Sequence, residues 1–268
     1  MNLLILSDAN SIHTQRWVLS LNKKGYNVRL FSLFKPNDVV AKLYDESGIK
    51  VYSSDLKHKV KNIIKPNLSK LIYLESIPKI KKIIKSFSPD IIHAHYASSY
   101  GLLATIINFR PFILSVWGSD LYDFPRKNFI NKWLINRVIQ SADCICSTSK
   151  AMAKIISEEY NRFDCKVIPF GIDTKLFIPT TQNFLPFTIG TIKSIEEYNG
   201  IDCLLNAARI IIYDKKNINV KFLIIGKGTL LKKMQKKCKE FNLENYVKFE
   251  GQISHQKIVK YYQKISVF

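Results

Sequence analysis

The stretch 2-NLLILSDANSIHTQRWVLSLNKKGYNVRLFSLF-34 predicts the fold of the first half of the chain. Residues 3–6 are apolar, residues 12–24 carry apolar positions at helical spacing and precede Gly25, and residues 28–34 are apolar again. A strand, a helix that ends at a glycine and a second strand form a βαβ unit. The two strands of such a unit lie parallel in one sheet.

The alternation of strand and helix patterns continues along the chain. We expect further strands at 91–95, 112–116, 144–147 and 167–170, and helices at 100–108 and 150–160. After a polar stretch flanked by Pro179 and Pro186, the pattern restarts, with strands at 187–191, 220–225 and 247–250 and helices at 202–213, 230–242 and 255–264. We therefore predict an α/β protein with two Rossmann-like, doubly wound parallel-sheet domains, 1–180 and 186–268.

The second domain is expected to be incomplete. Its last predicted strand begins at Ile265, and the sequence ends at Phe268. A parallel strand needs neighbouring strands and covering helices. We therefore interpret the 268 residues as a shortened form of a longer protein.

Length and composition exclude several classes of protein. Of the 268 residues, 47% are hydrophobic and 23% are charged, which is typical of a globular protein and not of a disordered or collagen-like one. No apolar run reaches the about 18 residues that a transmembrane helix needs. The N-terminus lacks the basic segment of a signal peptide, so we expect a cytoplasmic protein.

The cysteines do not predict a metal site. Five cysteines, at positions 144, 146, 165, 203 and 238, are an odd number, and none has a His or Cys partner at zinc-binding spacing. We expect reduced thiols and no bound metal.

The charge balance leaves two interpretations open. Forty-one Lys and Arg residues against 21 Asp and Glu give a net charge of +20, which suggests an anionic partner such as nucleic acid, a membrane surface or a phosphorylated substrate. Lys supplies most of the excess, as compositional bias would also produce. Because no RRM, KH, zinc-finger or basic-zipper pattern is present, nucleic acid is the least favoured of these partners.

The segment 57–87 is strongly basic and also carries apolar residues. Between Lys57 and Lys85 there are nine Lys and one acidic residue, Glu75, and the apolar positions 77, 80, 84 and 87 recur at helical spacing. Such a helix either lies on an anionic membrane surface or packs its apolar side into the domain core. We expect salt-sensitive binding to anionic membranes if the first interpretation holds.

Polar residues that follow strands are the candidates for chemistry, because ligands of doubly wound sheets bind at the carboxyl ends of the strands. In the first loop, His13 and Arg16 lie on the first turns of a helix that Ser11 can cap. In 90-DIIHAHYASSYG-101, His93 and His95 are two residues apart, so both point to one face of the strand.

Three further loops carry glycines at such positions. In 115-SVWGSD-120, a small-residue turn at Gly118 and Ser119 precedes Asp120, which can accept a hydrogen bond from a hydroxyl or form an ordinary Asx turn. The stretches 190-GTIK-193 and 225-IGKG-228 end two successive strands. In the second stretch, Gly226 and Gly228 can cradle a phosphate. Leu231 replaces the third glycine of the dinucleotide fingerprint, so a nicotinamide cofactor is disfavoured.

The order of these motifs resembles the retaining family 4 glycosyltransferases, which are two-domain GT-B enzymes. The resemblance covers the whole chain and includes ADCICSTS at 142–149, VIPFGIDTKLF at 167–177 and VKFEGQISHQKIVKYY at 247–262. It implies that a sugar passes from a nucleotide diphosphate donor, held mainly by the second domain, to an acceptor held by the first. It implies no metal and no cofactor, since the nucleotide sugar is a substrate.

The resemblance also assigns roles to residues. His95 matches the residue near the donor sugar and the reacting centre, with His93 as the second choice, and we expect His95 at the cleft between the domains. The acceptor and cleft residues are His13, Arg16, Gly118, Ser119 and Asp120. The donor residues are Gly190 and Lys193 for the pyrophosphate, Gly226 and Gly228 for phosphate, and Gln252 and Ile253 for the nucleobase.

The chain departs from the family pattern at two places. Thr191 and Asn199 stand where the family has Arg and Lys, which leaves Lys193 as the cation expected near the diphosphate. The family's pair of Glu residues separated by six positions would begin beyond Phe268.

The resulting prediction is a transferase with a glycan or lipid-linked acceptor in the synthesis of cell-surface polysaccharides such as lipopolysaccharide. It would be peripheral on the inner face of the plasma membrane. Two alternatives are a nucleotide-sugar epimerase of the same fold and, less favoured, a basic nucleic-acid-binding protein.

Overall fold

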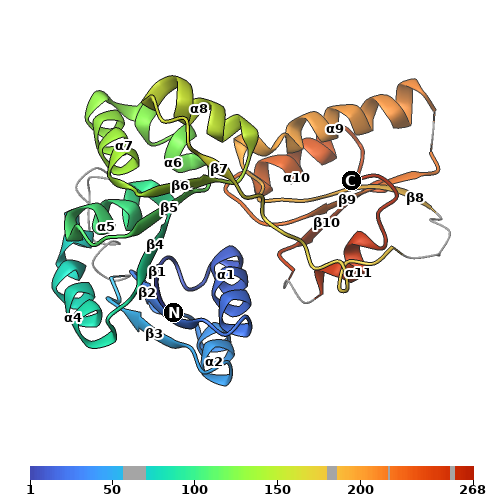
Figure 1. Ribbon diagram of the computed structural model, residues 1–268. Helices are drawn as coiled ribbons and strands as arrows, with labels where there is room; N and C mark the ends of the chain where they lie inside the picture. Colours follow the sequence, from blue (N-terminus) through green and yellow to red (C-terminus); the bar gives the residue numbers. More distant parts are fainter. Residues whose placement is uncertain (57–70, 180–185, 217, 254–256) are drawn as a thin grey trace. The chain divides into compact units, whose positions relative to one another are not determined.

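The computed structural model describes residues 1–56, 71–179, 186–216, 218–253 and 257–268 (Figure 1). The chain forms two compact units, Met1–Gly171 and Ile172–Phe268. This division lies before the expected boundary at 180–186, because residues 177 and 178 contact the C-terminal unit. The ring of Phe177 lies 5.7 Å from that of Tyr262, and Gln263 Nε2 donates to the Ile178 carbonyl at 3.3 Å.

The N-terminal unit is built on a seven-stranded parallel sheet with the order β3-β2-β1-β4-β5-β6-β7. Its strands are β1 Asn2–Leu6, β2 Asn27–Ser32, β3 Lys50–Ser53, β4 Ile91–His95, β5 Phe112–Val116, β6 Cys144–Ser147 and β7 Lys166–Val167. The strand order reverses between β1 and β4. A doubly wound sheet binds ligands at the carboxyl ends of the strands on either side of such a reversal.

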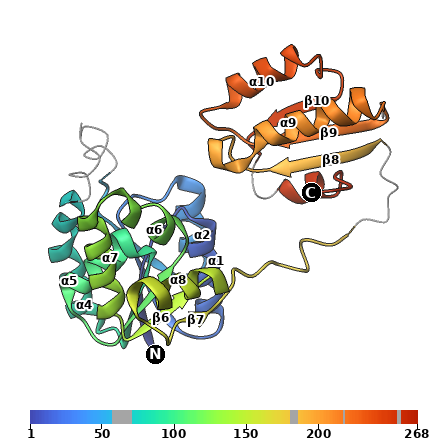
Figure 2. The same cartoon turned by 90° about the horizontal axis from the view of Figure 1, so that it is seen from above.

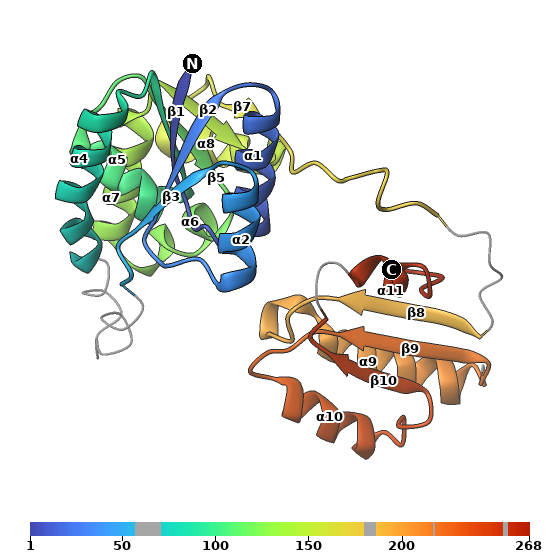
Figure 3. The same ribbon diagram turned by 90° about the horizontal axis from the view of Figure 1, so that it is seen from below.

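Strand β1 shows why helices cover both faces of this sheet. Successive side chains of a strand point to opposite faces. Accordingly Leu4 and Leu6 belong to one buried apolar cluster, whereas Leu3 and Ile5 belong to another. Figure 3 shows helices α1 Ile12–Lys23 and α2 Asp38–Glu46 on one side of the sheet and α4 Ile77–Phe87, α5 Leu102–Ile107 and α7 Phe129–Ser141 on the other.

Several elements differ from the sequence prediction. Helices α2 and α7 and strand β3 were not predicted, although Asn37 and Asn128 cap the two helices by accepting from Val40 N and Asn131 N. The helix expected at 100–108 begins earlier, as the π-helical turn η2 Tyr96–Gly101. The strand expected at 167–170 is the short β7, and α8 Lys150–Tyr160 agrees with the prediction.

Helix α4 decides between the two interpretations of the basic segment, as far as the structure describes it. Ile80, Ile83 and Phe87 are buried in the domain core, and Ile77 and Ile84 pack against it. The expectation that this apolar side enters a membrane is therefore wrong. The first part of the segment, residues 57–70, lies outside the described residues. The lysines of α4 are exposed: Lys79, Lys81, Lys82 and Lys85. Their electrostatic attraction to anionic lipid stays a prediction.

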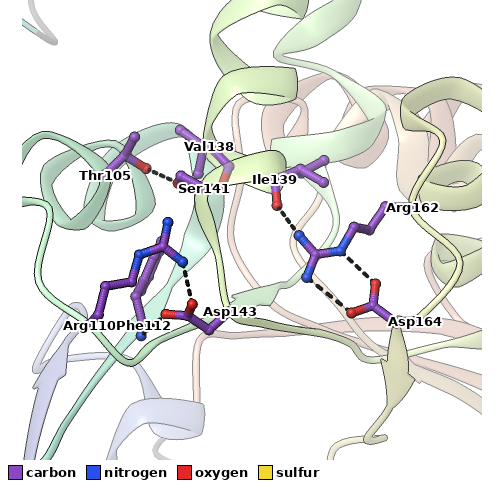
Figure 4. Close-up of polar contacts among 9 residues, drawn as sticks. All are labelled: Thr105, Arg110, Phe112, Val138, Ile139, Ser141, Asp143, Arg162 and Asp164. Atoms are coloured by element: carbon purple, nitrogen blue, oxygen red, sulfur yellow. Dashed lines mark hydrogen bonds and ion pairs between the residues drawn. The ribbon is translucent and has the colours of Figure 1, made fainter.

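Two carboxylates fix the end of α7 relative to the sheet (Figure 4). Asp143 accepts from the backbone N–H of Phe112 at 2.7 Å and from Arg110, so the end of α7 is held to the start of β5. Arg162 donates to the Ile139 carbonyl at 3.0 Å and forms a two-point ion pair with Asp164. Helix α7 is thereby held in a fixed position beside η2 and α5.

The C-terminal unit contains a smaller parallel sheet with the order β10-β9-β8. Its strands are β8 Phe187–Ile192, β9 Val220–Ile225 and β10 Val247–Gly251, and its helices are α9 Ile201–Arg209, α10 Leu231–Glu240 and α11 Ile258–Tyr262. Helices α9 and α10 cover one face, and α11 lies on the other (Figure 2). Beyond α11, Val267 pairs with Ile189 in a parallel bridge, as expected for an incipient strand at 265–268.

None of the helices in the described ranges is both long and apolar enough to cross a membrane.

Candidate active site

Two buried histidines lie at the carboxyl end of β4, beside the reversal of strand order. Because β4 pairs with β1 on one side and β5 on the other, each histidine has a serine partner on a neighbouring strand or strand end. His95 Nδ1 lies 3.1 Å from Ser7 Oγ, and His93 Nε2 lies 2.8 Å from Ser115 Oγ. The two imidazole rings meet edge to face with centroids 4.4 Å apart.

Burial keeps both imidazoles neutral. It lowers the pKa of His93 to about 4, and burial followed by the proximity of His93 holds the pKa of His95 well below its ordinary value. A histidine with so low a pKa is a poor general base near neutral pH, because an efficient base has a pKa close to the working pH. The neutral ring is suited to hydrogen bonding with a ligand hydroxyl.

His95 has one nitrogen available for such a bond. Its side chain is 0% exposed, and Nε2 is buried with no hydrogen-bond partner among the described residues. Ser7 Oγ also bonds Thr14 Oγ1 at 2.6 Å, which orients the serine hydroxyl and through it the ring. A buried polar atom without a partner costs free energy, which a ligand hydroxyl at Nε2 would restore.

Aromatic side chains cover the histidines. Trp117 lies 4.8 Å from the His95 ring, and Trp17 lies 5.3 Å from the His93 ring. His13 stacks on Phe170 at 3.6 Å, and both contact Trp117. Because Nε2 itself is buried, a ligand can reach it only when neighbouring side chains move.

His13 and Arg16 have different parts in this cover. Burial, with the charge of Arg16, lowers the pKa of His13, and its Nδ1 is buried without a described partner. Arg16 Nη1 donates to the Gly171 carbonyl at 2.7 Å, which holds the loop of Phe170 against α1. Arg16 is thus a positioning residue for the aromatic cover, and His13 offers a second free ring nitrogen close to Trp117.

Asp120 joins the loops that follow β4 and β5. Its buried carboxylate accepts from Ala97 N at 2.9 Å, from Trp117 N at 3.1 Å and from Gly118 N at 2.8 Å. Burial raises its pKa, whereas these backbone hydrogen bonds act to lower it. Both oxygens are engaged within the protein, so Asp120 makes the Asx turn considered above and also a bond across the two loops.

The neighbours of Asp120 shape the same turn. Gly118 has a φ of +139°, a conformation that favours glycine. Ser119 begins the short helix α6 Ser119–Tyr122, and its hydroxyl bonds the Tyr96 hydroxyl. Tyr96 has a φ of +76° where the chain turns from β4 into η2, which the carboxylate of Asp120 stabilises through Ala97 N.

A second candidate site lies in the C-terminal unit, where a cavity of about 720 Å³ opens beside the ends of β8 and β9. Five of the six donor residues predicted from the sequence line it: Lys193, Gly226, Gly228, Gln252 and Ile253. Gly190 does not line it. A Cβ at Gly190 would lie 2.6 Å from the Ile265 side chain, so this glycine provides room for packing.

Gly226 and Gly228 allow two loops to approach closely. A Cβ at Gly226 would lie 1.9 Å from the Lys193 carbonyl oxygen, and one at Gly228 would lie 2.2 Å from that of Ile195. The backbone bonds that join these loops include Lys193 N to Ile225 O and Ile195 N to Lys227 O, both at 3.0 Å. The sequence explained these glycines by contact with phosphate; the structure adds a requirement for loop packing.

Besides Lys193, the cavity wall contains two charged groups that the sequence analysis did not single out, Lys227 and Glu196. Among the described residues that line it, Lys193 and Lys227 are the cations and Glu196 is the anion. Glu196 accepts from Thr229 N at 3.0 Å and from the Thr229 hydroxyl, and these bonds lower its pKa. Asn199 donates to Ser194 O at 2.9 Å, so it holds the loop after β8 and does not line the cavity.

No three His, Cys, Asp or Glu side chains in the described part of the chain gather in a way that could hold a metal ion.

The two units, each built on a parallel sheet, share the GT-B fold of solved glycosyltransferases. The family model "Glycosyl transferase 4-like" matches residues 2–149, and "Glycosyl transferases group 1" matches residues 175–268. The chain belongs to the glycosyl transferase 4-like family.

Two sequence relatives and one solved structure of the same fold show how far the similarity extends. The glycosyltransferase MJ1178 of Methanocaldococcus jannaschii is 29% identical over 85% of this chain, which spans 65% of that protein's length. The teichuronic acid biosynthesis glycosyltransferase TuaC of Bacillus subtilis is 28% identical over a segment that covers 33% of this chain and 23% of the length of TuaC. The crystal structure of Anabaena HepE with UDP and glucose has a TM-score of 0.70 at 16% identity, covering 99% of this chain and 72% of HepE.

The neutral histidines predict how stability depends on pH. The unfolded chain binds protons at His93 below about pH 6.5, whereas the folded protein does so only below about pH 4. This site therefore contributes about 3 kcal/mol less to folding at pH 4 than at pH 7. In urea titrations, His93→Gln should flatten the fall in unfolding free energy between pH 6.5 and 4. An unchanged slope would contradict a buried neutral His93.

The loop packing predicts a large effect at Gly226. Gly226→Ala must shift the loop of Lys193 or adopt a strained backbone, so the C-terminal unit should lose more than about 2 kcal/mol of unfolding free energy. Gly171→Ala is the control, since nothing lies within 4 Å of a Cβ there. Equal urea midpoints for the two variants would show that the close approach is not needed.

Proposed function

We propose that this protein transfers a sugar, with retention of configuration, from a nucleotide diphosphate donor to a glycan or lipid-linked acceptor in cell-surface polysaccharide synthesis. The observation that carries the proposal is the match of both halves of the chain to glycosyltransferase family models, at residues 2–149 and 175–268.

The cavity of the C-terminal unit is the proposed donor site. HepE, which shares the fold, was crystallised with UDP and glucose. In this chain Lys193 and Lys227 can offset the negative charge of a diphosphate, and Gln252 can hydrogen-bond a nucleobase. Lys227 thus supplies a second cation although Thr191 and Asn199 replace the basic residues of the family pattern. The nucleotide sugar is the substrate, and we propose that neither a metal nor a further cofactor is required.

His95 is the proposed reacting-centre residue of the acceptor side. Retaining transfer develops positive charge on the sugar and negative charge on the leaving diphosphate, and both need a site from which water is excluded. The neutral Nε2 of His95 would bond a sugar hydroxyl and fix its position, while the aromatic cover of Trp117, His13 and Phe170 excludes water. The aromatic cover would have to move aside before the sugar could reach Nε2.

The biological setting follows from relatives and charge. TuaC is described as acting in teichuronic acid biosynthesis, and the fold also occurs in the lipopolysaccharide galactosyltransferase WaaB. We propose a cytoplasmic enzyme whose exposed lysines, Lys79, Lys81, Lys82 and Lys85, attract it to an anionic membrane surface. An epimerase of the same fold is the weaker alternative, because both family models describe transferases.

Substitution of His95 tests the proposal. In the full chain, assayed with UDP-sugars and released glycan acceptors, His95→Ala should lower turnover by about 10²-fold or more, since the hydroxyl loses its fixed partner. His95→Gln, whose amide can still form a hydrogen bond, should retain more activity than the Ala variant. Wild-type turnover in His95→Ala would remove His95 from the mechanism. Conversion of the nucleotide sugar to its epimer without consumption of an acceptor would favour the epimerase.

A further inference from the structure

The N-terminal unit contains an apolar pocket of about 410 Å³, separate from the histidine cluster. Its walls come from η1 Leu71–Ser76, α5 and α7, and include Leu74, Leu102, Ile106, Leu134, Ile135 and Val138. Its volume and apolar lining are typical of a small-molecule site.

The pocket is continuous with the loops of the candidate active site. Tyr96, Ala97 and Ser119 line it, and they are chain neighbours of His95 or Asp120. The hydroxyls of Tyr96 and Ser119 bond each other, and Ala97 N donates to Asp120. A molecule in the pocket therefore touches the same turns that position His95.

The pocket is also open to solvent on at least one side. Ile106, which lines it, is 45% exposed, although it is a large apolar residue on a helix whose Leu103 and Ala104 are buried. Asp123 and Lys127, of opposite charge, are the ionisable side chains of the lining other than Tyr96. The lining thus has no net charge to attract an ion, and its interior side chains offer dispersion contacts and removal of apolar surface from water.

We propose that this pocket binds the apolar chain of an amphipathic acceptor, an alkyl or isoprenoid group, while the acceptor's sugar lies at the turns of Tyr96 and Ser119. The inference rests on the proposed transferase function and narrows its acceptor to the lipid-linked class. Continuity with the His95 turns is the argument for this occupant, because the same acceptor must present a hydroxyl near the reacting centre.

Alkyl maltosides below their micelle concentrations serve as probes, with binding to the full chain measured by calorimetry. Each added CH2 that enters an apolar site should raise affinity about fourfold, so hexyl, octyl and decyl maltoside should bind progressively more tightly. Leu134→Trp, which fills the pocket, should weaken decyl maltoside binding at least tenfold. Ile130→Trp is the matched control, since Ile130 lies on the same helix, is 53% exposed and does not line the pocket.

A second variant guards against misfolding of the first. Ile106→Gln replaces an exposed wall residue, and it should weaken decyl maltoside binding while the urea midpoint stays that of the wild type. Affinity that does not depend on chain length, or that is equal in Leu134→Trp, Ile106→Gln and Ile130→Trp, overturns the inference. So does a dimer that Leu134→Trp dissociates, since a second copy would then occupy the pocket.

Failure of this inference is distinguishable from failure of the proposed function. Maltoside binding requires no catalysis and no donor, and sugar transfer to a released glycan requires no apolar chain. Transfer without chain-length-dependent binding would overturn the pocket assignment alone. Chain-length-dependent binding without transfer from any nucleotide sugar would contradict the transferase and leave an apolar binding site.

Discussion

The buried carboxylate of Asp120 is the interaction on which the N-terminal site depends. By accepting from Ala97 N, Trp117 N and Gly118 N, it joins the loops after β4 and β5. His95 directly precedes the first of these loops, and the loops carry Trp117 and part of the apolar pocket wall. The strained backbone of Tyr96 persists beside it because the surrounding bonds fix that backbone, and His95 Nε2 has no hydrogen-bond partner among the described residues. One carboxylate that touches no reacting group thus arranges three functional features.

The two units use different physical means to form their sites. In the N-terminal unit, burial removes charge from two histidines and leaves neutral hydrogen-bonding groups under aromatic rings. In the C-terminal unit, glycines let two loops meet, and Lys193 and Lys227 remain at an open cavity. The first environment suits a hydroxyl and a developing oxocarbenium ion, and the second suits a diphosphate. This division of labour is what transfer between two substrates requires.

Hydrophobic periodicity and the positions of the strand ends were sufficient to predict the parallel sheets and most of the donor cavity. The βαβ alternation gave the parallel sheets, and five of the six donor residues meet in one cavity because parallel strands end on the same edge. Long-range pairing could not be predicted: nothing local shows that Arg16 bonds Gly171 or that Asp120 bonds Ala97. The apolar side of α4 fits membrane or core equally well by spacing alone, and only packing against Ile92 and its neighbours in the core decides. Lys227 was missed because the stretch 225-IGKG-228 drew attention to its glycines alone, and Glu196 because nothing local shows that it bonds Thr229.

Hydrogen exchange of the full chain with and without UDP tests the central claim most directly, because it locates the nucleotide without requiring an acceptor. The account predicts slower amide exchange at residues 192–196, 225–229 and 252–253, which form the C-terminal cavity, and unchanged exchange in the pocket wall of α7. Protection confined to the turns after β4 and β5, or no protection at UDP concentrations that saturate related transferases, would contradict a donor site in the C-terminal unit.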